Sequence, residues 1–136
     1  MSDSRANDEV AIHAVLDASY QAWKSGDAER MVAQYTPDAT AIMTGSLRGG
    51  RDEIRRSMAL AFEGPLKGTS THNEQISLRF LGRDAAVVVS QSGILFAGET
   101  EVPDARKVNA TWVFEKRDGQ WLIVAYHNSP VLAPGP

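Results

Sequence analysis

The chain has 136 residues, enough for one domain with its own core and too few for separate catalytic and regulatory domains. It contains no cysteine, which excludes thiol nucleophiles, disulfides and cysteine-ligated zinc or iron–sulfur clusters. A net charge of −3 argues against a nucleic-acid partner, because such partners are bound by neutralising phosphates. The 43% hydrophobic and 23% charged content is typical of a folded globular protein.

No segment of the sequence predicts targeting to a membrane. Residues 1–5 show no apolar stretch behind a basic start, so we expect no signal peptide. The longest apolar run, Ala85–Val89, is far shorter than the roughly 20 residues of a membrane-spanning helix. We therefore expect a cytoplasmic protein without a membrane partner. One domain should cover residues 1–136, with an ordered core of about residues 8–130 and a frayed tail at 131–136.

The first half of the chain has the periodicity of helices. Apolar residues and one serine at helical spacing form a single stripe: Ile12, Val15, Leu16, Ser19 and Trp23. They predict a helix from about Asp8 to Ser25, and a second helix between Asp27 and Pro37 that includes Tyr35. We expect a short strand at Thr40–Met43, then a glycine-marked loop, then a third helix at Arg51–Phe62.

The second half alternates as strands do. Strands are expected at residues 75–80, 85–96, 108–116 and 120–129, and the last two are joined by an Asp118-Gly119 hairpin turn. Three helices followed by an antiparallel meander predict the α+β class, with the helices on one side of a curved sheet. The last strand is apolar at both parities, which indicates a central position.

Four segments carry a family resemblance: WKSGD at 23–27, YTPDAT at 35–40, GRDEI at 50–54 and RDGQWLIVAYHNS at 117–129. In this order and spacing they resemble the nuclear transport factor 2-like superfamily, with its SnoaL-like members, over residues 8–129. The ending, with His127 and Asn128, resembles the SgcJ/EcaC branch, which is associated with polyketide and enediyne biosynthesis.

The resemblance implies a cone-shaped barrel of three N-terminal helices packed on a strongly curved, mainly antiparallel sheet that encloses an apolar pocket. It also implies a homodimer through the outer face of the sheet, where we expect Trp121 and Ile123 because they alternate with the pocket residues. The superfamily includes isomerases, cyclases, hydratases and non-catalytic binding modules, so the fold alone does not decide the function.

Catalysis by paired carboxylates is not expected. When the pattern of ketosteroid isomerase, a well-known enzyme of the resembled superfamily, is laid over this chain, the helix tyrosine falls on Ser19, the general-base aspartate on Met43 and the second aspartate near Thr111. The seventeen acidic residues lie mainly at termini, helix ends, turns and polar faces. No phosphate loop, dinucleotide motif or zinc-helix spacing is present, so we expect no cofactor and no metal.

The remaining catalytic candidates are His72, His127 and Asn128. His72 opens a strand and could reach the mouth of the pocket. His127 is either a hydrogen-bonded histidine at the sheet or dimer edge or a ligand contact. It alternates with Asn128, so the two side chains should point to opposite faces.

The pocket lining is the main functional signal. Ser19 is either hydrogen-bonded to the backbone carbonyl four residues earlier or free to contact a ligand. The other expected lining residues match pocket-facing positions of the resembled family or add adaptable apolar surface. The expected lining is Ser19, Trp23, Tyr35, Met43, Met58, Phe62, Thr111, Val113, Val124, Tyr126 and Asn128.

Three functions fit this lining. The first is a binding or accessory protein of natural-product biosynthesis, which holds an elongated hydrophobic polyene or polyketide intermediate. The second is a cyclase, isomerase or hydrolase-like enzyme that uses Tyr126, Asn128, His72 or His127. The third is a dimeric assembly module whose pocket is incidental.

Overall fold

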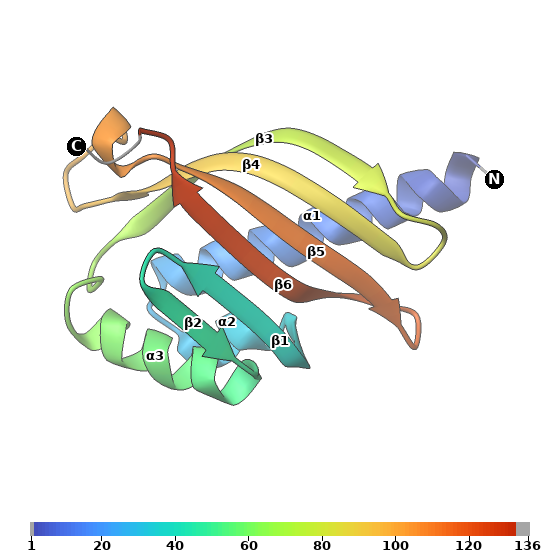
Figure 1. The fold of residues 1–136 in the computed structure, drawn as a ribbon, viewed down its shortest axis with the longest axis horizontal. Coiled ribbons are helices and arrows are strands. Elements are labelled where there is room, and N and C mark those ends of the chain that lie inside the picture. Colours follow the sequence, from blue (N-terminus) through green and yellow to red (C-terminus); the bar gives the residue numbers. More distant parts are fainter. Residues whose placement is uncertain (1, 133–136) are drawn as a thin grey trace.

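Within residues 2–132, which the computed structural model describes, six strands form one curved sheet and three α-helices cover one of its faces (Figure 1). Side chains are described for residues 5–132. The elements, in chain order, are α1 (Ser2–Lys24), α2 (Ala28–Val32), β1 (Tyr35–Met43), β2 (Ser46–Gly49), α3 (Arg51–Glu63), β3 (Ser70–Phe80), β4 (Ala85–Leu95), a 3₁₀ turn (Asp104–Arg106), β5 (Val108–Arg117) and β6 (Gln120–Pro130). The expected α+β class, with helices packed on a curved and mainly antiparallel sheet, is confirmed.

The strands follow the order β2-β1-β6-β5-β4-β3, and the sheet is open, with β2 and β3 at its edges. Only β1 and β6 pair in parallel among these described strands, and every other neighbouring pair is antiparallel. Strand β6 lies in the middle, between β1 and β5, as its apolar residues at both parities predicted. Helix α1 crosses behind β3 to β6 in Figure 1, so the sheet curves around it.

Two element assignments of the first half were wrong. Helix α2 ends at Val32, and Tyr35 begins β1 instead of continuing the helix. The carbonyl of Gln34 accepts a 2.8 Å hydrogen bond from the amide of Ile123, which draws this segment into the sheet. The expected glycine loop contains strand β2, whose residues 46–49 pair with residues 40–43 in a hairpin. Strand β6, which is far away in the sequence, supplies backbone hydrogen-bond partners to β1. Strand β1 in turn supplies them to β2 across a short turn. These partners are the reason that both segments form strands.

The hairpin between β5 and β6 turns as the sequence predicted. Asp118 has φ +50° and Gly119 has φ +79°, the pair of positive angles that a tight turn between antiparallel strands requires. The tail expected to fray includes residues 133–136, which lie outside the described residues. No helix in the described part of the chain is both long and apolar enough to cross a membrane.

A β-bulge changes which side chains of β6 face the helices. Val113 of β5 pairs with Ala125, but the next residue, Phe114, pairs with Ile123, so Val124 is the extra residue of β6. An extra residue shifts the alternation of a strand by one position. In β6, the odd-numbered side chains before the bulge, Trp121 and Ile123, therefore face the helices. After the bulge the even-numbered side chains, Tyr126 and Asn128, face them.

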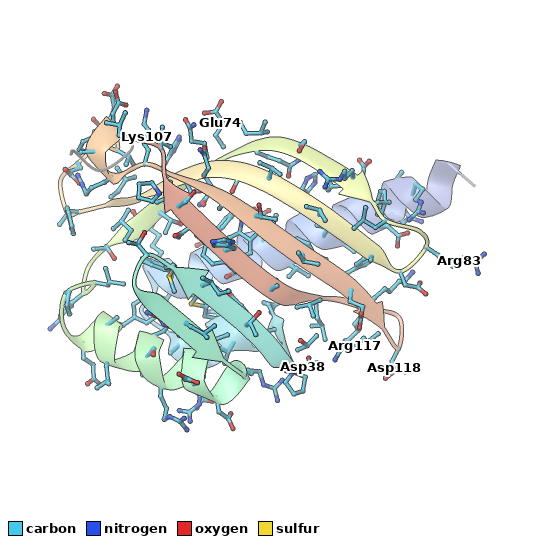
Figure 2. The ribbon with its side chains drawn as sticks, viewed as in Figure 1. Asp38, Glu74, Arg83, Lys107, Arg117 and Asp118 are labelled. Atoms are coloured by element: carbon cyan, nitrogen blue, oxygen red, sulfur yellow. The ribbon has the colours of Figure 1, made fainter. Side chains whose placement is uncertain are left out.

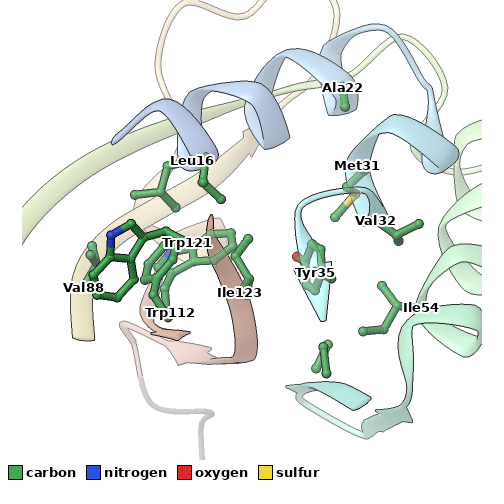
Figure 3. Packing of buried hydrophobic residues seen from close by; sticks show 14 of the residues in the cluster. Leu16, Ala22, Met31, Val32, Tyr35, Ile54, Val88, Trp112, Trp121 and Ile123 are labelled. Carbon is green, nitrogen blue, oxygen red and sulfur yellow. The ribbon is translucent and has the colours of Figure 1, made fainter. Parts of the chain in front are cut away.

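The expectation that Trp121 and Ile123 lie on the outer face of the sheet was wrong. Trp121 is 4% exposed and Ile123 is fully buried, and both pack against α1 in the core. Figure 3 shows them on the same side as Trp112, below Leu16. The indole N–H of Trp121 also donates to a carboxylate oxygen of Asp8 at 2.9 Å. Uniform alternation along β6 had placed these side chains outside, and the bulge turns them inward.

Candidate functional site

A cavity of about 220 Å³ lies between the helices and the concave face of the sheet. The helical side contributes a mainly apolar group: Ser19, Tyr20, Trp23, Met31, Ile54, Met58 and, just after α3, Leu66. Strands β1 and β2 and the parallel partner β6 contribute one group: Tyr35, Ala41, Met43, Arg48, Tyr126 and Asn128. The remaining strands and the loop before β5 contribute Thr71, Asn73, Ser92, Gly93, Ile94, Arg106, Val108 and Trp112.

Trp23 is held in the cavity wall by contacts on two sides. Its indole N–H donates to the Thr69 hydroxyl at 3.0 Å, and that hydroxyl donates to the carbonyl of Leu66 at 2.7 Å. The ring of Phe62 meets the Trp23 ring edge-on, with centroids 5.5 Å apart. Phe62 therefore supports Trp23 from behind and does not itself line the cavity.

All three tyrosines of the chain line this cavity: Tyr20, Tyr35 and Tyr126. Burial raises the pKa of each phenol above its ordinary value. For Tyr35 and Tyr20 the nearby Tyr126 phenol adds to the rise in pKa, while the Ser19 hydroxyl and then the Arg48 charge act in the opposite direction on Tyr35. At neutral pH the three phenols are protonated and can act as hydrogen-bond donors in a mainly apolar space.

A polar network fixes the sheet side of the cavity. The Asn128 amide donates to the Tyr126 phenol oxygen at 2.8 Å. The Tyr126 ring lies 4.4 Å from the ring of Trp112, whose indole N–H donates to the Ser90 hydroxyl at 3.3 Å. Ser90 and Ser92 share a further hydroxyl contact of 3.2 Å. The arrangement orients two aromatic rings and one amide toward the same space.

The structure brings seven of the eleven expected lining residues into this one cavity: Ser19, Trp23, Tyr35, Met43, Met58, Tyr126 and Asn128. Tyr35 reaches it from a strand and not from a helix. Four expected residues lie elsewhere: Phe62, Thr111, Val113 and Val124. Thr111 and Val113 alternate with Trp112, which faces the cavity, and Val124 is the bulge residue. The inward parity assumed for β5 was therefore off by one residue.

Several polar lining residues were not expected from the sequence, among them Tyr20, Arg48 and Asn73. Tyr20 follows Leu16 by four residues and precedes Trp23 by three, a helical spacing that could have identified it. Arg48 depended on recognising β2 as a strand. Asn73 depended on β3 beginning at Ser70, several residues before its apolar alternation becomes visible.

The three catalytic candidates do not lie together in the structure. Asn128 lines the cavity, whereas His72 and His127 are exposed strand residues outside its lining. The third histidine, His13, lies 3.0 Å from the Gln75 side-chain oxygen through its Nε2 atom. It belongs to a second, more polar hollow of about 320 Å³ that adjoins the first at Tyr20 and Asn73. The lining of this hollow is His13, Leu16, Asp17, Tyr20, Asn73, Gln75, Val88 and Ser90.

The charged groups of the main cavity are two arginines, and no aspartate, glutamate or histidine lies among its described lining residues. Arg106 is neutralised by Glu99 at 2.5 Å and also donates to the carbonyl of Ile94 at 2.8 Å. Within the described part of the chain, no group of three or more histidine, aspartate and glutamate side chains is placed to hold a metal ion.

An open curved sheet, three helices on its concave face and an apolar cavity between them define a domain of the cystatin-like type. The sequence pattern of the SnoaL-like domain family matches residues 12–134, and the chain belongs to this family. The expected relationship to the nuclear transport factor 2-like superfamily is thereby confirmed. No curated protein matches the chain in a sequence search.

Solved structures share the fold across most of the chain. A domain of unknown function with a cystatin-like fold from Nostoc punctiforme is 29% identical, with a TM-score of 0.85, and the match covers 93% of this chain and 79% of that one. A nuclear transport factor 2-like protein from Novosphingobium aromaticivorans is 17% identical, with a TM-score of 0.81 and coverage of 96% and 86%. A ketosteroid isomerase-like protein from Erwinia carotovora is 20% identical, with a TM-score of 0.72 and coverage of 91% and 96%.

Proposed function

We propose that this protein binds a hydrophobic small molecule in the cavity between α1, α3 and the sheet, as an accessory or binding protein and not as a catalyst. The observation that carries the proposal is the composition of the lining. Methionine, tryptophan and isoleucine side chains supply adaptable apolar surface, and phenols and amides supply a few oriented polar contacts. This is the usual make-up of a site that orients a ligand.

The absence of a general base from the described lining favours binding over catalysis. Proton abstraction from carbon requires a carboxylate, histidine or comparable group within hydrogen-bond reach of the substrate. The phenols of the cavity have raised pKa values, so they stay protonated at neutral pH and cannot serve as that base. They can still donate hydrogen bonds to a ligand carbonyl.

The ligand class in this proposal is a polyene or polyketide intermediate held in a cone-shaped space. Two features support it: membership of the SnoaL-like family and the likeness of the chain's ending to the SgcJ/EcaC branch of polyketide and enediyne biosynthesis. The volume of about 220 Å³ is small for a complete elongated product. An elongated ligand would therefore be held by one end.

Diphenylhexatriene, a neutral polyene that fluoresces in apolar surroundings, tests the proposal. We expect saturable binding at one site per chain and quenching or energy transfer involving Trp23 and Trp112, which both line the cavity. Ala41→Leu adds a larger side chain at a buried lining position, and we expect it to weaken binding about tenfold or more.

Ala14→Leu is the matched control, because it adds the same atoms at an exposed position of α1. If both leucine variants fold and bind diphenylhexatriene equally well, the dye lies elsewhere and the proposed site is wrong. An equal loss in both variants would likewise contradict it.

A second candidate function, an isomerase or cyclase, is favoured by one observation, the hydrogen bond between Asn128 and Tyr126 inside the cavity. A protonated phenol aligned in this way could polarise a substrate carbonyl. This candidate predicts that wild-type protein converts a bound polyketide-like ketone. It also predicts that Tyr126→Phe abolishes conversion while binding is retained. If the wild-type protein binds the ketone without converting it, the enzyme candidate is wrong and the accessory role is favoured.

We also propose a homodimer through the outer face of the sheet. Apolar side chains that alternate with cavity-facing neighbours lie on this face: Ile42, Leu47, Val113 and Ala125. In Figure 2 the labelled charged residues Asp38, Glu74, Arg83, Lys107, Arg117 and Asp118 lie towards the edges of this face. Light scattering at micromolar concentration should give twice the chain mass. Ala125→Glu should give monomers, while Asp38→Glu, a change at the rim, should leave the dimer intact.

A further inference from the structure

Arg48 is a guanidinium in the cavity wall. It lies on β2, pairs directly with Ala41 of β1, and both residues line the cavity. Residues paired in an antiparallel ladder share a face of the sheet, so the side chain of Arg48 extends to the same side as its buried neighbour. Its Nη1 atom donates to the sulfur of Met58 at 3.2 Å, and Met58 is itself a buried lining residue. The charge is therefore placed against the cavity and is only half-buried.

No described carboxylate neutralises this charge. The ion pairs of the described residues involve other arginines and lysines, and Arg48 is in none of them. Glu53, five residues further on, accepts instead from the amide of Gly49 at 3.1 Å. The other arginine of the lining, Arg106, is already paired with Glu99. Among the described residues, the side chain of Arg48 therefore donates its one side-chain hydrogen bond to a weak sulfur acceptor and has no ion-pair partner.

An unpaired guanidinium beside apolar walls is a hydrogen-bond donor site that can bind an anion. Partial removal from water disfavours the charge unless an opposite charge or good acceptors compensate. The planar fork of an arginine matches the two oxygens of a carboxylate, which it can bind through two parallel hydrogen bonds. The charge of Arg48 also acts to lower the pKa of the Tyr35 phenol, so it favours negative charge in this part of the cavity. The apolar wall around Met58 and Ile54 then suits the hydrocarbon part of the same molecule.

We infer that the ligand is an amphipathic carboxylic acid whose carboxylate pairs with Arg48 while its apolar chain lies in the cavity. The inference rests on the proposed binding function and narrows its ligand to acids. A carboxylate fits better than a phosphate monoester, because a single unpaired cation balances one negative charge and a phosphate carries nearly two. Diphenylhexatriene, a neutral polyene, can enter the same apolar space but leaves Arg48 unpaired.

Octanoate and octanol form a matched pair of probes, since they share a chain length and differ in the charged head group. Calorimetry or quenching of tryptophan fluorescence measures both affinities. We expect the wild-type protein to bind octanoate about tenfold or more tightly than octanol. Arg48→Gln should remove this preference by weakening octanoate and leaving octanol unchanged. Arg48→Lys should restore part of it, because lysine keeps the charge and loses the fork.

Arg56→Gln is the control, since it removes the same charge from an exposed position of α3, and it should keep the full preference. Equal affinity of wild-type protein for the two probes overturns the inference and leaves the proposed binding function standing. An unchanged preference in Arg48→Gln overturns it as well. Binding of neither octanoate nor octanol, with no binding of diphenylhexatriene, overturns the proposed function and the inference together. The wild-type comparison needs no variant, so it decides even if Arg48→Gln fails to fold.

Discussion

The side-chain amide of Asn128 donates a 2.8 Å hydrogen bond to the phenol oxygen of Tyr126, two residues earlier on β6. Side chains two positions apart on a strand share a face, so this contact links two groups that both look into the cavity. It also works against the effect of burial, since the bond lowers the pKa of a phenol that burial raises.

Asn128→Ala should therefore raise the pKa of Tyr126 further. The variant removes the donor that favours the phenolate, and burial then acts unopposed. Ultraviolet titration of tyrosinate measures the change, and Tyr126→Phe identifies which of the three transitions belongs to this residue. We expect a stability loss of about 1 kcal/mol for the alanine variant. A Tyr126 transition that stays in place or moves to lower pH would contradict the assignment.

Alkaline pH should destabilise the fold through the tyrosines. All three have folded-state pKa values above the ordinary value of about 10, so their protonated forms stabilise the folded state. This contribution is complete below about pH 10 and is lost as the pH rises towards the folded-state values. Urea unfolding should show a lower free energy of unfolding at about pH 11 than at about pH 8. In Tyr35→Phe, which lacks one buried phenol, the difference should be smaller.

Gly93→Ala should destabilise the sheet. A Cβ atom at this position of β4 would lie 2.3 Å from Cγ1 of Val102 and 3.1 Å from its Cβ atom. Val102 is 7% exposed, so it has little room to move aside. We expect a loss of about 1–3 kcal/mol in the free energy of unfolding. Combining Gly93→Ala with Val102→Ala should cost less than the sum of the two single changes, whereas simple additivity would exclude the clash.

Deleting Val124 should prevent folding. Without the bulge, the alternation of β6 would be uniform, and the side chains of Trp121 and Ile123 would turn away from the core when Tyr126 faces the cavity. We expect no cooperative transition in thermal or urea unfolding. Val124→Ala keeps the bulge and should cost about 1 kcal/mol. A cooperatively folded deletion variant with buried tryptophan fluorescence would show that the register adapts.

Much of the fold followed from local pattern. The third helix, the two long hairpin strands and the Asp118-Gly119 turn formed where the periodicity and turn chemistry placed them, since these signals act over a few residues. Tyr35 was different. Its neighbours read as helix, but the backbone of Ile123, nearly ninety residues away, provides the hydrogen bond that makes the segment a strand.

The site residues also fall into two groups, those that the local sequence pattern predicted and those that it did not. Ser19, Trp23 and Met58 were recognisable from the sequence because helical spacing alone places them on buried faces. Thr111, Val113 and Val124 were misplaced because strand alternation predicts two faces without saying which is inside, and a bulge interrupts the alternation without a sequence signal. Arg48 entered the site only when β2 was paired with β1 in the sheet.

The length, the lack of cysteine and the succession of a helical first half and a strand-rich second half were determined by the sequence itself, and with them the α+β class and the exclusion of thiol chemistry. The tertiary structure alone decided which side chains meet. It gathered all three tyrosines around one cavity, turned two histidines away from it, and left Arg48 there without a carboxylate partner among the described side chains. The physical reason is that covalent order and periodicity determine local elements, whereas the pairing of distant strands and one extra residue in β6 determine what faces the interior.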